Sequence, residues 1–356
     1  MIYLDSAATT PVTQPVLDAM IPYFTESFGN PSSLYSLGRE AKKAINNARK
    51  QFANAINAEP EQIFFTSGAT ESNNLIRRNN NTISSLYEHP SMKTEFQVGD
   101  KDGLEIELNK AGRRGIRDLV VCWQYVNSET GKIFPIKEYA DLAHAHGYKF
   151  HSDCTSAFSK VKVDVKELNL DFASFSGHKF HAPKGVGVLY IKDPANFKSD
   201  IVGGRQEKGL KSGTENVASI VGLGKAAELY NWDKMHDYRL KRTRAGLSIA
   251  IVEKMSGHIC VLNSEEQAPN ILCLALENII GENMMLALDS EDIFVSTGSA
   301  CHSGSNEITP IINLFNVPDN NKRGIIRISF DKSLSEDTIT FIADAISRYR
   351  KQFLGL

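Results

Sequence analysis

Two residues of complementary chemistry each come shortly after an apolar run. Asp153 follows the run at 148–151, and Lys179 follows the run at 172–175. A lysine amine can form a Schiff base with an aldehyde cofactor, and a carboxylate can keep a pyridine nitrogen protonated. If the two runs are neighbouring strands, this pair stands at one edge of a sheet and suits pyridoxal phosphate. A solvent-facing lysine that merely follows a strand is the alternative interpretation.

A phosphate group also needs a binding turn, and one candidate precedes a polar stretch that can start a helix. Ser67-Gly68-Ala69-Thr70 follows the apolar run at 62–65. Small residues, a hydroxyl group and unpaired N–H groups at the positive end of a helix suit an anion. Many turns between a strand and a helix have this composition, so the turn is a weak signal by itself.

The elements that must position these residues alternate along the chain. Apolar residues between 37 and 58 recur at intervals of three and four, which predicts an amphipathic helix. Strands alternating with helices predict an α/β fold with a mostly parallel sheet, whose ligands bind at the carboxyl ends of the strands. Apolar runs typical of strands lie at 62–65, 119–126, 148–151, 172–175 and 186–191.

A second, smaller domain is predicted after this region. A charged helical pattern over 231–255 carries the chain out of the sheet, and 333–349 has apolar residues on one helical face. Ser333 and Glu336 have the spacing of a capping box, so the last helix should begin there.

Composition and charge limit the classes of protein. The 356 residues suffice for about two domains, and 40 Lys and Arg residues against 42 Asp and Glu residues give a formal charge of −2. Direct binding to nucleic acid is therefore not expected. The chain opens without a basic and apolar leader and has no uncharged apolar run of membrane-spanning length, so we expect a cytoplasmic protein with no membrane partner. Five scattered cysteines predict neither a disulfide framework nor a metal site.

Seven motifs, in order from residue 3 to residue 301, resemble those of the NifS/IscS-type cysteine desulfurases. They are YLDSAATTP, GNPSS, FTSGATESNN, EHPS, SGHKF with HAPKGVG, SGTENV and STGSAC. The resemblance implies a fold-type-I enzyme that depends on pyridoxal 5'-phosphate, with a large domain over 13–245 and a small α+β domain formed by 1–12 with 246–356. The implied reaction removes sulfur from L-cysteine, leaving L-alanine and a persulfide on Cys301 for transfer to an acceptor protein.

The resemblance also implies roles for single residues. Lys179 resembles the lysine that binds the cofactor covalently, Asp153 the partner of the pyridine nitrogen, and His89 the histidine that lies against the cofactor ring and relays protons. Thr214 resembles a threonine that the family supplies from the second subunit, so a homodimer is implied. The positions that would bind the phosphate are Ala69, Thr70, Ser176 and His178.

Two serines depart from the family at cofactor-binding positions that face the phenolic oxygen. Ser128 stands where a second asparagine usually follows Asn127, and Ser156 stands where glutamine is common. A serine hydroxyl reaches less far than an amide, so it would satisfy this oxygen less well. Arg205 and Lys211 replace a usual glycine and a usual arginine at the mouth of the site.

Three residues are expected to contact the substrate: Arg327, Asn127 and Asn30. An isolated arginine in the strand-like run 325–329 needs a partner, and a substrate carboxylate would supply it. The resemblance implies the same role. A structural ion pair is the alternative.

Cys301 differs from the other cysteines because its stretch, 296–305, consists mostly of small residues. This composition is typical of a mobile surface loop, whose thiolate could take up the sulfur and carry it away. Cys154 should line the cofactor pocket. Inert core positions are expected for the cysteines in apolar runs, Cys122, Cys260 and Cys273.

Other activities stay open. A selenocysteine lyase would share Lys179 and Asp153 but depend less on Cys301. A general class V aminotransferase would leave the STGSAC motif without a purpose, and a non-catalytic binding or scaffold homologue is supported only by Ser128 and Ser156. The sulfur acceptor is open between an iron–sulfur scaffold, a tRNA- or DNA-modifying enzyme and a cofactor pathway.

Overall fold

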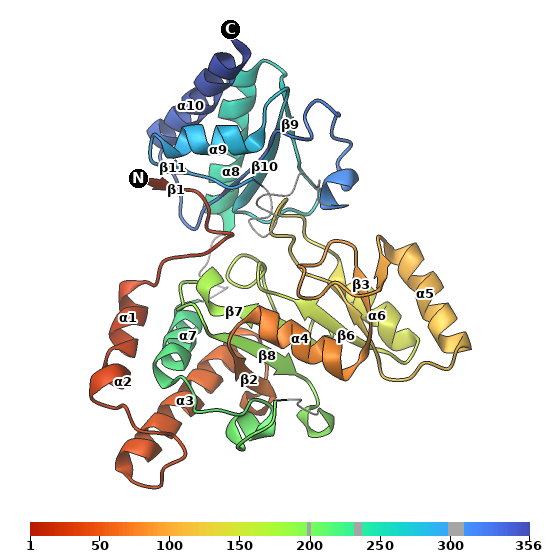
Figure 1. The fold of residues 1–356 in the computed structure, drawn as a ribbon, viewed down its shortest axis with the longest axis vertical. Coiled ribbons are helices and arrows are strands. Elements are labelled where there is room, and N and C mark those ends of the chain that lie inside the picture. The colour runs from red at the N-terminus through yellow and green to blue at the C-terminus, as the bar shows by residue number, and fades with distance from the viewer. Residues whose placement is uncertain (198–200, 231–236, 298–309) are drawn as a thin grey trace. The chain divides into compact units, whose positions relative to one another are not determined.

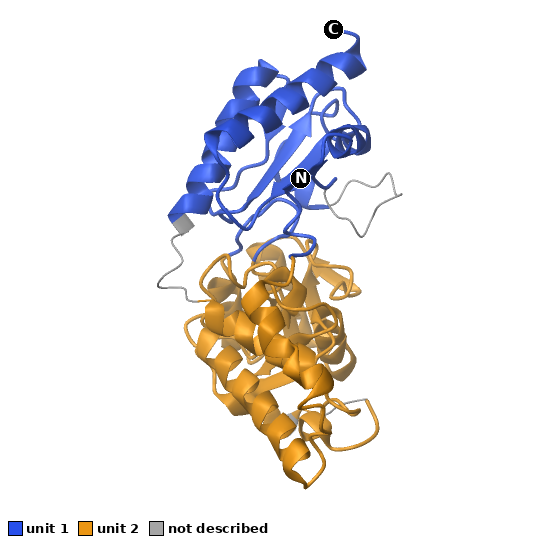
Figure 2. Cartoon of the chain, turned by 90° about the vertical axis from the view of Figure 1, so that its left-hand side faces the viewer, with its two compact units in different colours: residues 1–10, 126–134, 236–356 blue, residues 11–125, 135–235 orange. Residues whose placement is uncertain are grey.

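The chain folds into two compact units, each built from separate stretches of sequence (Figure 2). The computed structural model describes residues 1–197, 201–230, 237–297 and 310–356. The domains expected from the resemblance, 13–245 and 1–12 with 246–356, stay a prediction. The units are unit 1, with 1–10, 126–134 and 236–356, and unit 2, with 11–125 and 135–235.

Unit 2 is organised around a seven-stranded sheet of order β2-β8-β7-β6-β5-β3-β4 (Figure 1). The strands from β7 to β4 pair in parallel, whereas β8 is antiparallel to both β2 and β7. The prediction of an α/β fold with a mostly parallel sheet is therefore confirmed. The strands are β2 (Ile63–Thr66), β3 (Asn81–Ser85), β4 (Phe96–Val98), β5 (Leu119–Cys122), β6 (Lys149–Asp153), β7 (Phe172–Ser176) and β8 (Gly187–Ile191).

Helices pack on both faces of this sheet, because alternate strand residues point to opposite sides. On one face, Phe172 of β7 joins Leu75 of α4 in a buried apolar cluster. On the other face, Phe175 of β7 contacts Phe52 of α3, with ring centroids 5.1 Å apart. The helices of unit 2 are α1 (Gln14–Met20), α2 (Pro22–Thr25), α3 (Ser36–Ala55), α4 (Ala69–Asn79), α5 (Lys101–Arg113), α6 (Ile136–Ala145) and α7 (Val217–Leu229).

Two predicted boundaries move by a few residues, each for a local reason. The helix expected over 37–58 ends at Ala55, just before Asn57, whose φ of 56° is left-handed. The strand expected over 119–126 ends at Cys122. Val126 instead pairs with Ile133, outside this sheet.

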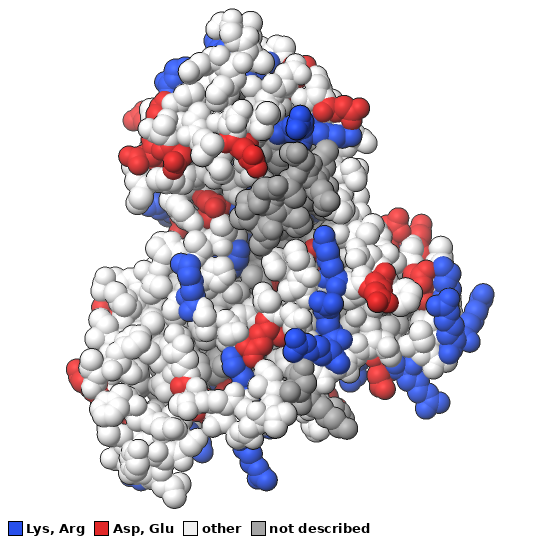
Figure 3. Space-filling model, viewed as in Figure 1, with Lys and Arg blue, Asp and Glu red and all other residues white. Residues whose placement is uncertain are grey.

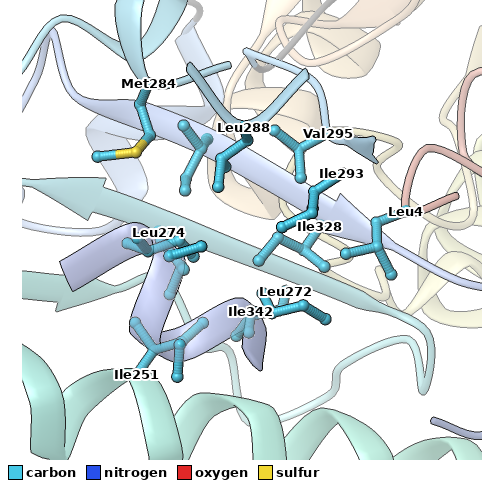
Figure 4. Packing of buried hydrophobic residues seen from close by; sticks show 14 of the residues in the cluster. Leu4, Ile251, Leu272, Leu274, Met284, Leu288, Ile293, Val295, Ile328 and Ile342 are labelled. Atoms are coloured by element: carbon cyan, nitrogen blue, oxygen red, sulfur yellow. The ribbon is translucent and has the colours of Figure 1, made fainter. Parts of the chain in front are cut away.

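Unit 1 combines a three-stranded antiparallel sheet, β12-β10-β9, with the parallel pair β1 and β11. Its core joins Leu272 and Leu274 of β10 to Ile251 of α8, Ile342 of α10 and Leu4 near the N-terminus (Figure 4). The first residues of the chain therefore share a core with its last helix. The elements are β1 (Ile2–Tyr3), α8 (Asp237–Met255), β9 (Ile259–Val261), β10 (Ile271–Leu276), α9 (Gly281–Asp289), β11 (Ile293–Phe294), β12 (Ile325–Ser329) and α10 (Glu336–Leu354).

The segment 126–134 joins unit 1 through backbone pairing. Lys132 forms a bridge with Gln267, and the N–H of Ala268 donates to the carbonyl of Gly131 at 2.7 Å. The central stretch of the chain is thus held by residues that come more than one hundred positions later.

The last helix begins later than expected. The N-cap of α10 is Ser335, whose hydroxyl accepts a hydrogen bond from Thr338 N at 3.2 Å. The predicted capping box on Ser333 and Glu336 is therefore wrong. Ser335 holds the capping position, which places Glu336 in the first turn, where its charge favours the helix N-terminus.

The visible surface of unit 2 carries both signs of charge. Figure 3 shows Lys and Arg interspersed with Asp and Glu on this face. Across the described ranges of the chain, no helix has both the length and the apolar character that a membrane span requires.

Candidate active site

The site residues that the sequence predicted in unit 2 gather at one edge of its sheet. β6 ends at Asp153 and β7 ends at Ser176, and Asp153 is opposite Ser174 on the two parallel strands. Lys179 lies in the 3₁₀ turn Gly177–Lys179, which follows β7 directly. The carboxylate and the amine therefore leave the sheet at the same edge.

Asp153 is nearly buried, with 7% of its surface exposed. Its Oδ2 accepts a hydrogen bond from Asn73 Nδ2 at 2.9 Å, and its Oδ1 accepts one from Thr155 N at 2.9 Å. Both donors are neutral, so they orient the carboxylate without cancelling its charge. A protonated ring nitrogen would supply the compensating charge. Ser156 lies in the same turn, directly after Thr155.

The turn between β2 and α4 approaches the sheet closely because two glycines meet there. A Cβ on Gly187 would lie 2.6 Å from Gly68 Cα, so a larger residue does not fit. Gly68 has a φ of 154°, and a Cβ on it would lie 3.5 Å from Ser176 Oγ. No described side chain caps α4, whose first residues are Ala69 and Thr70. Uncapped N–H groups beside a serine hydroxyl fit a phosphate.

His178 shares the turn after β7 with Lys179. Burial, together with the positive charges of Lys179 and Lys184, lowers the pKa of His178 to about 4. Its imidazole is therefore neutral at pH 7 and keeps one N–H group to donate. Gly177 lets this turn pack tightly, because a Cβ there would lie 3.1 Å from Ala182 Cβ.

His89 belongs to a chain of hydrogen bonds that ends on Asp153. Its Nδ1 lies 2.8 Å from Ser91 Oγ and 3.1 Å from Ser91 N. Asn73 Nδ2 donates to Ser91 Oγ at 2.9 Å and to Asp153 Oδ2 at 2.9 Å. Sequence analysis singled out His89 and Asp153 but missed the two residues between them. Asn73 and Asp153 are 80 positions apart, so no local pattern connects them.

Glu88, next to His89, is a buried carboxyl group that sequence analysis also missed. Its Oε1 accepts hydrogen bonds from Ser85 Oγ at 2.7 Å and from Gln124 N at 2.6 Å. Burial, reinforced by the negative charge of Asp153, raises the pKa of Glu88 to about 8. Glu88 is therefore mostly protonated at pH 7 and adds little negative charge near Asp153. The EHPS motif contains this residue, but its type alone does not show that it is buried.

Arg327 of β12, in unit 1, is buried and bound by two oxygen atoms. Its Nη2 lies 2.6 Å from Asp5 Oδ1, and its Nη1 donates to the carbonyl of Ser128 at 2.9 Å. Asp5 thus supplies the ion pair that was the alternative for this arginine, and its role toward a substrate stays a prediction. Asn127 Oδ1 accepts from Thr130 N at 2.9 Å, so its carbonyl group stabilises the local turn.

The stretch before Thr214 is tied to other parts of unit 2 by two ion pairs. Arg49 of α3 contacts the buried carboxylate of Glu207 through both Nη atoms, at 2.9 and 2.6 Å. Lys211 Nζ lies 2.9 Å from Glu71 Oε2, in the first turn of α4. Lys211, one of the departures from the family, therefore has a structural partner next to the candidate phosphate site.

Asn30 and Thr214 are exposed, as are two other predicted site residues, Thr70 and His89. Asn30 Oδ1 accepts a hydrogen bond from Ser32 N at 2.9 Å. Thr214 follows Gly213, whose φ of 111° belongs to the region that favours glycine. The contacts that the resemblance implies for Asn30 and Thr214, with the substrate and with the second subunit, stay predictions.

The cysteines differ in exposure. Cys301 lies outside the described residues. Burial raises the pKa of Cys273 to about 12, which makes its thiol inert near neutral pH. The expected core position is wrong for Cys260, which is only half-buried because it lies on the edge strand β9. Free and buried thiols are those of Cys122, Cys154 and Cys273.

The chain is similar to known proteins over almost its whole length. The family described as Aminotransferase class-V matches residues 2–340. The cysteine desulfurase IscS of Clostridium botulinum is 36% identical over 379 aligned positions, which cover 99% of this chain and 94% of that protein. The solved NifS-like protein of Rickettsia africae has a TM-score of 0.85 at 27% identity and covers 99% of both chains. A structure of SspA in complex with cysteine has a TM-score of 0.74 at 28% identity, and covers 94% of this chain and 100% of that one.

Proposed function

We propose that this chain, which belongs to the class-V aminotransferase family and within it to the cysteine desulfurases, removes sulfur from L-cysteine with bound pyridoxal 5'-phosphate. L-Alanine leaves, and the sulfur passes to Cys301 and then to an acceptor protein. The observation that carries the proposal is the sheet edge where Asp153, Lys179 and the N-terminus of α4 come together. The structural relative SspA, described in complex with cysteine, supports this substrate.

The residues at this edge fit the cofactor group by group. Lys179 offers the amine for its aldehyde, and Asp153 offers a fixed carboxylate for its ring nitrogen. The first turn of α4, with Ser176 and His178, offers neutral donors for its phosphate. When bound, pyridoxal phosphate supplies an electron sink for the carbon atoms of the substrate.

The other predicted residues complete the reaction. Arg327 binds the substrate carboxylate, and the ion pair with Asp5 keeps its guanidinium group oriented. The thiolate of Cys301 takes the sulfur atom as its bond to carbon breaks. Cysteine without its sulfur is alanine, and the two sulfur atoms remain on the protein as a persulfide. Thr214 completes the site of a second copy in a homodimer.

Borohydride reduction tests the cofactor site. Reduction of the purified protein, followed by digestion and mass spectrometry, should place the pyridoxyl group on Lys179. Lys184 is a matched control, because it is a nearby lysine that follows the same strand. Lys179→Arg should lose the covalent link, whereas Lys184→Arg should keep it. A pyridoxyl group on Lys184 would overturn the assignment.

Cys301 gives a second test. Cys301→Ser should abolish the protein persulfide, because a hydroxyl cannot accept the sulfur, while cofactor absorbance and Tm stay at wild-type values. The half-exposed thiol of Cys260 is the control, and Cys260→Ser should form alanine and persulfide normally. Alanine release from L-cysteine and alkylation of the persulfide are the two measurements. If Cys301→Ser forms alanine at the wild-type rate, a selenocysteine lyase type of reaction, without a protein persulfide, explains the chain better.

A further inference from the structure

We infer that Ser91 and Asn73 hold His89 in a single tautomer, with Nδ1 unprotonated and the proton on Nε2. The contacts of the ring within unit 2 carry this assignment. The functional importance of this tautomer rests on the proposed function, which places His89 beside the cofactor. Ser91 and Asn73 would be positioning residues, which act through His89.

The backbone of Ser91 gives the first argument. Its N–H lies 3.1 Å from His89 Nδ1. A backbone amide can only donate, so Nδ1 must offer its lone pair. A proton on Nδ1 would point at the amide hydrogen and break this hydrogen bond.

The side chains give the second argument. An ionised carboxylate only accepts, so the Asn73 atom next to Asp153 Oδ2 is the amide nitrogen. This nitrogen has two N–H groups, and the second one donates to Ser91 Oγ at 2.9 Å. The Ser91 hydroxyl keeps its own hydrogen and can donate it to His89 Nδ1 at 2.8 Å, which is the direction that the unprotonated Nδ1 requires. The donor directions agree along the whole chain.

The tautomer decides what the imidazole can do. Nδ1 accepts two hydrogen bonds, so a proton there breaks the one from the Ser91 amide and makes the Ser91 hydroxyl rotate to accept instead. Nε2 carries the hydrogen, and His89 therefore presents a donor, not a base, at that atom. Asn73 is fully buried and also binds Asp153, so it gives the imidazole and the carboxylate a common anchor.

Nitrogen NMR of the holoenzyme tests the assignment. The chain has nine histidines, so labelling histidine with ¹⁵N gives few signals, and the signals missing in His89→Gln belong to His89. Protonated and unprotonated ring nitrogens have well-separated shifts. We expect Nδ1 of His89 at the unprotonated position and Nε2 at the protonated one. The reverse pattern would overturn the inference.

Variants of Ser91 show whether the chain sets the tautomer. Ser91→Ala removes one donor, so the ratio of the two tautomers should fall by about three- to tenfold. Ser91→Thr keeps the hydroxyl and should restore the wild-type spectrum. Thr94 is a matched control, because its hydroxyl lies in the same connection but bonds to Ser84 and Phe96. Thr94→Val should leave the His89 signals unchanged. Unchanged signals in Ser91→Ala would contradict the role of the chain.

The experiment separates this inference from the proposed function. The nitrogen spectrum needs no turnover, whereas the function is judged by cofactor on Lys179 and by alanine from L-cysteine. If alanine forms but His89 has the other tautomer, the inference alone fails. If the tautomer is as stated but no cofactor binds Lys179, the proposed function alone fails. With both intact, Ser91→Ala should lower kcat more than it changes KM, and Ser91→Thr should restore it.

Discussion

At the scale of single residues, two carboxyl groups near the same edge of the sheet, Asp153 and Glu88, have different surroundings. Asp153 is bound by two neutral donors at the end of β6. Glu88 is fully enclosed, and burial keeps it protonated over much of the neutral range. A proton on Glu88 keeps a second negative charge away from the neighbourhood of Asp153.

The raised pKa of Glu88 makes stability depend on pH. Between pH 4.5 and about 8 the folded chain binds a proton that the unfolded chain releases. The contribution of Glu88 to the free energy of unfolding is therefore fully present below pH 4.5 and falls as pH rises, by about 1.4 kcal/mol per unit. Glu88→Gln keeps the acceptor for Ser85 and Gln124 and cannot ionise. The difference in Tm between Glu88→Gln and wild type should therefore rise steadily, in favour of the variant, from pH 5 to pH 8.

An exposed glutamate serves as the control for this series. Glu105 lies on the open side of α5, so Glu105→Gln should follow the wild-type Tm at every pH. Parallel curves for wild type and Glu88→Gln would show that Glu88 is already ionised in the folded protein at the low end of the range.

Sequence could predict the residues that follow strands but not those that act through distant partners. Asp153 and Lys179 come after apolar runs, and Gly68 starts a helix, so local pattern marks all three. Nothing local marks Asn73 as a ligand of Asp153. Cys301 was predicted from its small neighbours, and its role stays a prediction.

At the scale of elements, a buried ion pair fixes the stretch that leads to Thr214. The carboxylate of Glu207 accepts from both Nη atoms of Arg49 and from Phe65 N at 2.8 Å. Glu207 and Lys208 have φ values of 46° and 59°, which residues with side chains adopt rarely. The ion pair therefore holds an unfavourable backbone turn against α3 and β2.

Removing the arginine should be costly. Arg49→Met leaves the buried Glu207 carboxylate without its cation, and we expect a loss of about 3–5 kcal/mol in the free energy of unfolding. Adding Glu207→Gln should recover part of this loss, because the unpaired charge disappears. Arg39 on the same helix is exposed and bonds to the carbonyl of Leu34, so Arg39→Met should change stability little. Urea denaturation of the four proteins measures the differences, and equal losses for Arg49→Met and Arg39→Met would contradict the account.

Helices and strands could be predicted where apolar residues keep one spacing along the whole segment. The long helix α3 and the buried strands β6, β7 and β8 have clear patterns. Helix ends do not follow from periodicity, because they depend on single residues. Asn57 ends one helix with a left-handed φ, and Ser335 begins another in place of Ser333.

At the scale of the whole molecule, the chain passes between the two units four times. Alternating strands and helices predicted the sheet of unit 2. No change in composition marks 126–134, since its place in unit 1 depends on pairing with Gln267 and Ala268. A pairing between segments that lie far apart in the sequence cannot be predicted from the spacing of apolar residues within either segment.

Gly131 is the position where this pairing leaves no room for a side chain. Its φ is 79°, and a Cβ would lie 2.6 Å from Gln267 Nε2 and 2.9 Å from Ile271 Cβ. Gly115 has a similar φ of 68° but nothing within 4 Å. Gly131→Ala should therefore lower the free energy of unfolding by about 1–3 kcal/mol more than Gly115→Ala does. Chemical denaturation of both variants isolates the packing cost from the conformational cost, and equal losses would show that the segment can move away from unit 1.

The return of the N-terminus to unit 1 sets an order of events during synthesis. All strands of the sheet in unit 2 lie between residues 63 and 191, so this sheet can form while the ribosome is still translating the rest. The N-terminal strand must wait, because Ile2 pairs with Ile293 and the N–H of Ala7 donates to Ser329 Oγ, 322 positions later. Leu4 has no exposed surface in the folded chain, but it stays in contact with water or with a chaperone until β12 has been made. Residues 2–7 are thus made before every strand of that sheet and are among the last to reach their native contacts.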